Sequence, residues 1–289
     1  MSLRKKAAAS IVAVAATFAL AACGGDDSDT IKVGTTDQGQ EQWQVFEQEA
    51  KAAGLDIELV PFGDYSLPNR ALDEGEIDVN NFQHLMFLAD FNVNSGTDLT
   101  PIGATEIIPL ALFYKDHSEI KDVEEAGEIA IPNDPTNQGR ALHMLAANDL
   151  VKLKDDSLLS PTPADVDEGA SKVKVTPVDA AQTVTAYQDG KPAVINNSFL
   201  DRGNIDPKSA IAQDDPASPE AEPFINAFVT TADRKDDPEL KKLVEVWHSD
   251  KVQEAIDRQS NGTSVEVEKD GAELKEILTG IEDKIKESK

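Results

Sequence analysis

Segments that predict β-strands alternate along this chain with segments that predict helices, and this alternation limits the choice of fold. Residues 31–35 alternate in polarity as a strand does, and helical spacing of apolar residues follows until Gly54. Residues 55–62 predict a second strand, and the pattern restarts with a strand over residues 128–131. Parallel strands need crossover connections that are usually helical. We therefore expect an α/β fold with parallel or mixed sheets covered on both faces.

One apolar run is too long for a single ordinary strand. Residues 100–114 are mostly apolar and are interrupted by Pro109. We expect this run to pass between two lobes, the first made of residues 31–112 and 228–289 and the second of residues 113–227. Ligands of open α/β sheets bind at the carboxyl ends of the strands, so two such lobes predict a shared cleft.

Two polar segments of the second lobe predict loops. Residues 132–139 are rich in Pro, Asn and Asp, and we expect the next helix to cover residues 140–150. Residues 201–222 are polar and contain three prolines.

Two helices are expected at the C-terminal end. The first begins at Pro238, a good first helical position after Asp237, and its apolar residues recur as far as Ile256. The second carries apolar residues at helical spacing from Leu274 to Ile285.

The N-terminus has the organisation of an export signal. Basic residues occupy positions 4–6, and residues 7–22 are small and apolar, too short a stretch for a comfortable membrane span. Residues 20–24, Leu-Ala-Ala-Cys-Gly, resemble the lipobox of bacterial lipoproteins. This predicts a lipoprotein signal peptide over residues 1–22. The alternative is an ordinary secretory signal followed by a stray cysteine.

The single cysteine of the chain, Cys23, is the residue that the lipobox predicts to be lipidated. Alone it forms neither an internal disulfide nor a multi-thiolate metal site. Acyl chains anchor a protein by burial of their CH₂ groups in lipid. Residues 23–30, rich in Gly, Asp and Ser, predict a flexible tether between the anchor and the folded protein.

The charge of the chain excludes one large class of partners. The 54 acidic and 27 basic residues give a formal charge of −27, and removal of the leader with its three basic residues leaves −30. Nucleic-acid binding needs clustered Lys and Arg, which are absent after position 6, so we expect no nucleic-acid partner. The acidic residues are spread along the chain and predict a strongly solvated surface, with calcium binding or salt adaptation as the alternative.

The common catalytic motifs are absent from the sequence. It contains no G-x-S-x-G, H-E-x-x-H, Walker loop or G-x-G-x-x-G, and no two of the four histidines have metal-ligand spacing. A Ser/His/Asp triad needs no sequence proximity and stays open, but nothing favours one. We expect a protein that is not an enzyme and that holds no cofactor or metal.

Three polar segments follow predicted strands, namely residues 63–69, 78–84 and 132–140. Asn, Asp, Pro and Gly are common turn residues, so each segment alone has a structural explanation. Together they are similar to the MetQ/NlpA family, the methionine-binding lipoproteins of bacterial ABC importers. The resemblance rests on F-G-D-Y-S-L-P-N-R-A-L, I-D-V-N-N-F-Q-H and A-I-P-N-D-P-T-N-Q-G-R-A-L. It is supported by V-I-N-N and P-F-I-N, and it extends from Ile31 to about Trp247.

The resemblance implies a two-lobed periplasmic-binding-protein fold, type II-like, with a free amino acid in the interlobe cleft. It implies that Arg140 grips the ligand carboxylate, for which a guanidinium offers a matching fork. It implies that Asn137 adds a hydrogen bond, and that Asn196 and Asn226 bind the amino and carboxylate groups. An amide carries both a donor and an acceptor and so suits a zwitterion.

The resemblance further implies that Tyr65, Phe82 and His84 form the walls of the side-chain pocket. Aromatic rings make favourable contacts with a thioether sulfur. Two departures from the family pattern lie nearby, Leu-Met-Phe-Leu at residues 85–88 and Ile-Ile-Pro at residues 107–109. The acidic helix after Gly271 extends beyond the usual end of the family, and we expect it to be a packed or solvated extension.

The function implied is capture of L-methionine, with D-methionine as a further candidate ligand, at the extracytoplasmic face of the cell membrane. The ligand is then delivered to an ABC permease with an ATPase subunit. One alternative keeps the fold and binds another small apolar amino acid or a short peptide. Others are a surface lipoprotein used for adhesion and an exported hydrolase, whose nucleophile and base we do not find.

Overall fold

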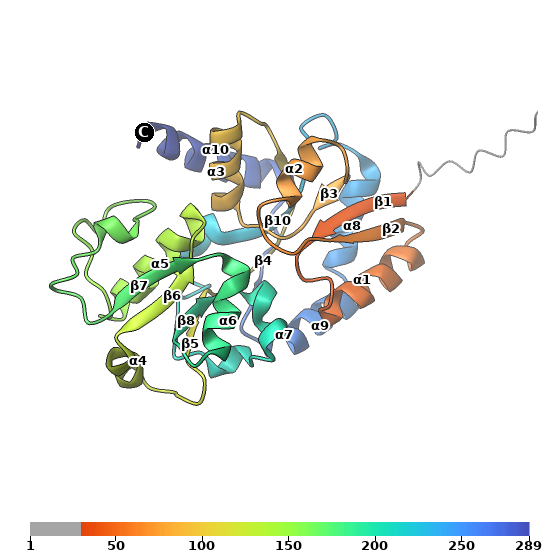
Figure 1. Cartoon of the computed structure of the whole chain (residues 1–289). Coiled ribbons are helices and arrows are strands. Elements are labelled where there is room, and N and C mark those ends of the chain that lie inside the picture. Colours follow the sequence, from red (N-terminus) through yellow and green to blue (C-terminus); the bar gives the residue numbers. More distant parts are fainter. Residues whose placement is uncertain (1–29, 289) are drawn as a thin grey trace, which may run out of the picture.

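The computed structural model describes residues 30–288 and contains two β-sheets, each covered by helices on both faces (Figure 1). The expected signal peptide, Cys23 and nearly all of the tether lie outside the described residues. Among residues 30–288, no helix has the length and apolar character needed to cross a membrane.

The first sheet is mixed and has the strand order β11-β4-β10-β3-β1-β2. Strands β1, β2 and β3 run parallel to one another, whereas β10 pairs antiparallel with both β3 and β4, and β11 pairs antiparallel with β4. The strands are β1 (Thr30–Thr35), β2 (Asp56–Pro61), β3 (Val79–Asn80), β4 (Thr100–Ile107), β10 (Ile225–Thr230) and β11 (Val265–Glu266).

Two apolar clusters cover the faces of this sheet. On one face, Trp43, Phe46, Phe228 and Trp247 pack ring against ring with centroids 5.0–5.8 Å apart. This face is covered by α1 (Glu41–Ala52), α8 (Pro238–Trp247) and α9 (Asp250–Ser260). The other face is covered by α2 (Pro68–Asp73), α3 (Leu85–Ser95) and α10 (Gly271–Glu287).

The second sheet has the order β7-β6-β8-β5-β9, in which β6, β7 and β8 are parallel and β5 and β9 are antiparallel additions. Its strands are β5 (Ala111–Phe113), β6 (Glu128–Pro132), β7 (Lys174–Val178), β8 (Ala193–Ile195) and β9 (Ala212–Gln213). Helices α4 (Ile120–Ala126) and α5 (Pro135–Ala147) cover one face, and α6 (Thr183–Gln188) and α7 (Leu200–Gly203) cover the other. Both sheets confirm the mixed α/β architecture.

The chain passes between the sheets twice. The apolar run over residues 100–114 divides into β4 of the first sheet and β5 of the second, and Ile108-Pro109-Leu110 forms the crossing. The return lies between β9 and β10. Since β5 begins at Ala111 and β10 at Ile225, the sheets change two or three residues earlier than the expected lobe limits at 113 and 228.

Three local expectations were wrong. The segment 132–139 is not a loop throughout, because α5 begins at Pro135 with the Asp134 carboxylate accepting a hydrogen bond from the Asn137 N–H at 2.9 Å. The single helix expected from Pro238 to Ile256 is two helices that meet at Ser249. The polar segment 201–222 contains β9, which pairs with β5.

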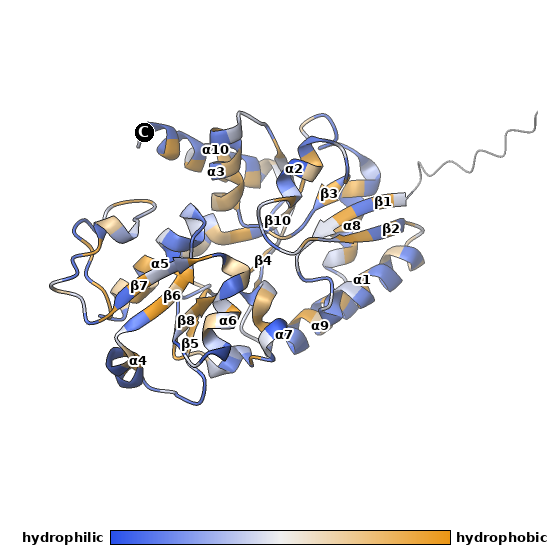
Figure 2. Ribbon diagram, viewed as in Figure 1, coloured by the Kyte–Doolittle hydropathy of each residue, from blue (hydrophilic) through white to orange (hydrophobic). Residues whose placement is uncertain are grey.

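The C-terminal helix α10 is packed on the first lobe. It lies beside α3 in Figure 1, and its apolar face buries Leu274, Leu278, Ile281 and Ile285. Asp270 caps its N-terminus in a reciprocal pair with Glu273, with bonds of 3.0 Å in both directions. Figure 2 shows that strands β6 and β8, in the interior of the second sheet, are hydrophobic. Helix α4 and much of α9, which cover the sheets, are hydrophilic.

Candidate functional site

A small cavity lies between the two lobes. All seven residues that the sequence predicted for ligand binding line it. From the first lobe come Tyr65, Phe82, His84 and Asn226, and from the second Asn137, Arg140 and Asn196.

Arg140 is held in place by groups on three sides. Its Nε and Nη2 atoms donate to the carboxylate of Asp214 at 2.5 and 3.2 Å, and Nη2 also donates to the Ile108 carbonyl at 2.8 Å. The guanidinium lies 4.2 Å from the ring centroid of Phe224. Asp214 thus occupies the Nε–Nη2 edge of the guanidinium that the resemblance implies for a ligand carboxylate. Within residues 30–288, Nη1 donates no hydrogen bond.

Asn137 connects two polar side chains of the cavity, His84 and Asn196, to the cap of α5. As the third residue of α5, it donates through Nδ2 to the helix-capping carboxylate of Asp134 at 2.9 Å. Its Oδ1 accepts from Asn196 Nδ2 at 2.9 Å and lies 3.3 Å from Nε2 of His84. Both acceptor positions of the Asn137 side-chain oxygen are therefore taken by protein donors. The main effect of Asn137 is to orient His84 and Asn196.

His84 is a neutral group with a fixed tautomer. It caps α3, and its Nδ1 accepts a hydrogen bond from the Phe87 N–H at 3.1 Å, so the ring proton resides on Nε2 and is donated to Asn137. Burial, and next the positive charge of Arg140, lower the pKa of His84 to about 3. The site therefore contains one cation rather than two near neutral pH.

Asn196 presents an unused acceptor to the cavity. Its Nδ2 donates to Asn137. Its Oδ1 is buried, in a residue only 9% exposed, and has no hydrogen-bond partner among residues 30–288. An unpaired buried carbonyl costs free energy unless a donor from a ligand or water reaches it. Asn226 is anchored differently, because its Nδ2 donates to the Glu106 carbonyl at 3.2 Å.

Three aromatic rings, those of Tyr65, Phe82 and Phe87, line the cavity, and Phe199 packs against Tyr65 without lining it. Tyr65 lies 5.9 Å from Phe82, 6.0 Å from Phe87 and 5.0 Å from Phe199, measured between ring centroids. Phe199 belongs to the short helix η4 (Asn197–Phe199) of the second lobe, so the aromatic cluster includes both lobes. Burial raises the pKa of Tyr65, whose hydroxyl thus stays protonated.

A buried amide network fixes the segment that carries Phe82 and His84. Asn69 Nδ2 donates to Gln83 Oε1 at 2.7 Å, and Gln83 Nε2 donates to Asn80 Oδ1 at 3.0 Å. Asn80 Nδ2 completes the network by donating to Asn69 Oδ1 at 3.0 Å. These three amides are all less than 4% exposed, so their bonds hold the pocket wall rather than meet solvent.

Direct bonds join the lobes around the cavity. Arg202 of the second lobe donates to the carbonyls of Gly63 and Thr36 at 3.0 and 3.3 Å. Gln259 of α9, in the C-terminal part of the first lobe, donates to the Asp201 carboxylate of the second lobe at 2.9 Å. Together with the Tyr65–Phe199 contact, these bonds connect the two lobes.

The comparison with known proteins agrees with this geometry. The sequence profile described as NlpA lipoprotein matches residues 31–268. The chain belongs to the NlpA lipoprotein family. MetQ of Salmonella typhi, a D-methionine-binding lipoprotein, is 38% identical over 274 residues, which are 92% of this chain and 99% of that protein.

Solved structures of similar proteins share the two-lobed fold of this NlpA family member. Protein PG110 from Staphylococcus aureus has a TM-score of 0.81 at 33% identity and covers 87% of this chain and 99% of its own. A nutrient-binding protein from Burkholderia cenocepacia, solved bound to methionine, has a TM-score of 0.75 at 36% identity, with 82% and 99% covered. Helix α10 lies beyond the residues that match the family profile.

Some residues that shape the cavity of this NlpA protein were missed in the sequence. Asp214, which binds Arg140, stands in a segment of turn-forming residues and carries no signal of its own. Phe87 follows His84 by three residues, a helical spacing that places both on one face, and this signal was available. Ser198, Phe199 and Phe224 have no comparable pattern.

Proposed function

We propose that this protein is a lipid-anchored substrate-binding protein that captures methionine and delivers it to the permease of an ABC importer. The observation that carries the proposal is the arrangement inside the cleft. A buried guanidinium with an unused Nη1, an unpaired amide oxygen and an aromatic wall lie around one cavity. These are the three recognition elements that an apolar α-amino acid requires.

Each part of the ligand has a protein group of matching chemistry. The carboxylate pairs with Nη1 of Arg140, and Asp214 keeps the guanidinium in position without blocking that nitrogen. The ammonium donates to Oδ1 of Asn196, the acceptor that no protein group uses. The thioether packs against Tyr65 and the neighbouring rings, where sulfur–aromatic contacts contribute about 0.3–1.5 kcal/mol each.

The same family membership supports the proposed anchor and the proposed transport partners. Diacylation at Cys23 holds the protein at the extracytoplasmic face of the cell membrane, and residues 24–30 give it reach. Closure of the lobes on the ligand presents a surface to the permease, whose ATPase subunit supplies the energy. The protein itself performs no reaction in this proposal, in keeping with the binding function of its named relatives.

Calorimetry and thermal unfolding with a panel of amino acids test the proposal. The protein is unfolded and refolded first, so that ligand carried through purification is removed. L-methionine at 100 times its Kd should raise the unfolding free energy by about 2.7 kcal/mol. D-methionine, leucine and methionine-containing dipeptides are tested in parallel, since a short peptide or another apolar amino acid is the alternative. A response to one of these without a response to methionine contradicts the proposal.

A further inference from the structure

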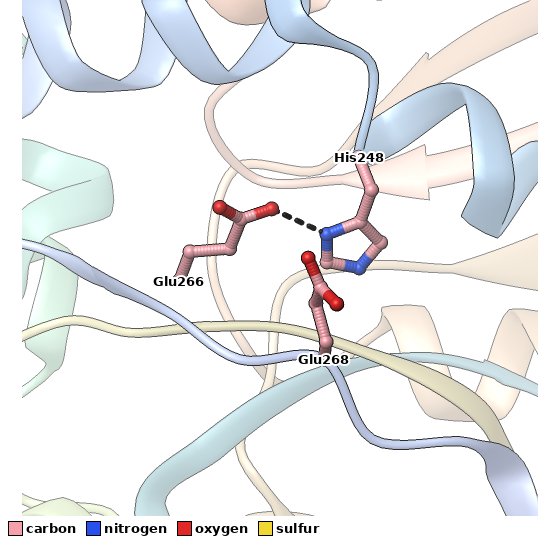
Figure 3. Close-up of side chains that lie close together, drawn as sticks. All are labelled: His248, Glu266 and Glu268. Carbon is pink, nitrogen blue, oxygen red and sulfur yellow. Dashed lines mark hydrogen bonds and ion pairs between the residues drawn. The ribbon is translucent and has the colours of Figure 1, made fainter.

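Three potential metal ligands converge on the surface of the first lobe, away from the cleft. They are His248, at the end of α8, and Glu266 and Glu268, in and just after β11 (Figure 3). One ligand atom from each lies within 4.8 Å of the others. The proposed transport function does not use any of the three.

The backbone brings the two carboxylates to the same side of the sheet edge. Glu266 is paired with Glu106 of β4, and the next residue, Val267, donates its N–H to the Thr105 carbonyl at 3.0 Å. Side chains alternate along an extended chain, so Glu266 and Glu268 project to one side. Val267 projects to the other side, where it packs against the core.

The imidazole of His248 is oriented by a bond to the backbone. Its Nε2 donates to the Ala104 carbonyl at 2.9 Å, which leaves Nδ1 directed at Oε1 of Glu266 at 2.7 Å. Metal-binding histidines are commonly oriented in this way, with the second ring nitrogen donating to a carbonyl or carboxylate. Over residues 30–288, neither Glu266 nor Glu268 forms an ion pair with a lysine or arginine.

We propose that His248, Glu266 and Glu268 form a binding site for a divalent transition-metal ion, best matched by Zn²⁺. One imidazole nitrogen and two carboxylate oxygens are ligands that zinc accepts, and a water completes a tetrahedral set. The nitrogen ligand disfavours Ca²⁺ and Mg²⁺, which prefer oxygen. The bound ion ties the end of α8 to the strand that leads into α10.

A simple ion pair between His248 and Glu266 is the competing explanation. The involvement of Glu268 distinguishes the metal site from this ion pair. The ion pair needs a second proton on the imidazole and does not involve Glu268, whereas the metal site needs all three side chains. The Glu268 side chain forms no hydrogen bond in residues 30–288. Glu268→Gln therefore removes the negative charge of one proposed ligand without disturbing the contacts of His248. Glu168→Gln, at an exposed carboxylate of the second lobe, is a control with the same change of charge.

Calorimetric titration of the EDTA-treated lipoprotein in detergent with Zn²⁺ tests the proposal. One saturable site is expected, weakened at least about tenfold by Glu268→Gln and unchanged by Glu168→Gln. The ¹⁵N resonance of Nδ1 in His248 should shift when Zn²⁺ is added to the wild type, and His248→Gln should abolish the site. Equal affinities in the two Gln variants, or the absence of saturable binding, overturn the proposal. Methionine titration of the same variants confirms that each is folded.

Discussion

The carboxylate of Asp214 binds the guanidinium of Arg140 along one edge, at 2.5 Å from Nε and 3.2 Å from Nη2. Asp214 also accepts a hydrogen bond from the Leu110 N–H at 2.9 Å, so it links the crossing between the lobes to the cationic group of the cleft. The positive charge that the sequence predicted is therefore present, but its partner is part of the protein. In the function proposed above, the ligand carboxylate pairs with a guanidinium already fixed in direction by Asp214.

Asp214→Asn should weaken methionine binding about tenfold while leaving the protein folded. The amide keeps one acceptor for Leu110 but loses the charge that holds Arg140, whose side chain is only 5% exposed. Isothermal titration measures the loss, and the accompanying drop in unfolding free energy should be about 1–3 kcal/mol.

The substitution Asp215→Asn at the next residue is the matched control. The Asp215 side chain lies in an exposed turn, where it accepts a hydrogen bond from the Ala217 N–H and, among residues 30–288, from no other group. Arg140→Ala should remove measurable binding altogether. If Asp214→Asn and Asp215→Asn bind methionine equally, Asp214 does not position Arg140 for the ligand.

Glu106 should make the stability of the protein depend on pH. Burial is the main cause that raises its pKa to about 7, from 4.5 for the free side chain. Between these values the folded state binds more protons than the unfolded state. The unfolding free energy therefore falls as pH rises from about 4.5 to 7, by at most about 1.4 kcal/mol per pH unit.

Glu106→Gln should flatten this dependence, because the amide keeps an acceptor for Trp247, whose Nε1 donates to Oε2 at 3.2 Å, but does not titrate. Chemical unfolding at a series of pH values gives the difference between the two proteins. Glu168→Gln, an exposed change of the same charge, should follow the wild type. Parallel curves for wild type and Glu106→Gln would mean that Glu106 is ionised in the folded protein throughout.

Helix α10 should contribute substantially to stability although it lies beyond the family profile. Leu278 of α10 is fully buried in the apolar cluster that includes residues of α3 and β4, so Leu278→Ala should lower the unfolding free energy by about 2–5 kcal/mol. Leu67, which is 50% exposed, provides a control of identical chemistry, and Leu67→Ala should change it by less than about 0.5 kcal/mol. A small effect at Leu278 would show that α10 is only loosely attached.

Local pattern and the resemblance together predicted most of the cleft. The strand–helix alternation predicted mixed sheets, and the polar segments after the strands do meet at one cavity because strand ends of both lobes face it. The N-terminus of α5 was misplaced although Asp134-Pro135 is a good capping pair, since Asn and Asp also favour turns.

The remaining features depend on contacts distant in sequence. Asp214 is 74 residues from Arg140, and nothing near it in the chain indicates that pairing. The break between α8 and α9 also has no strong local signal, because apolar spacing continues across His248 and Ser249. Strand β11 has only two residues, both exposed, and it forms because β4 offers a free edge.

Gly103 should be intolerant of even a methyl group. It lies in β4 against Val244 of α8, and a Cβ built on it would be 2.3 Å from Cγ1 of Val244. Because that contact is far inside van der Waals distance, Gly103→Ala should lower the unfolding free energy by about 1–3 kcal/mol through overpacking. The double variant Gly103→Ala/Val244→Ala should recover part of this loss, since the second substitution removes the clashing methyl groups. Thermal and urea unfolding of the two single variants and the double variant give the coupling energy, and strictly additive losses would place the clash elsewhere.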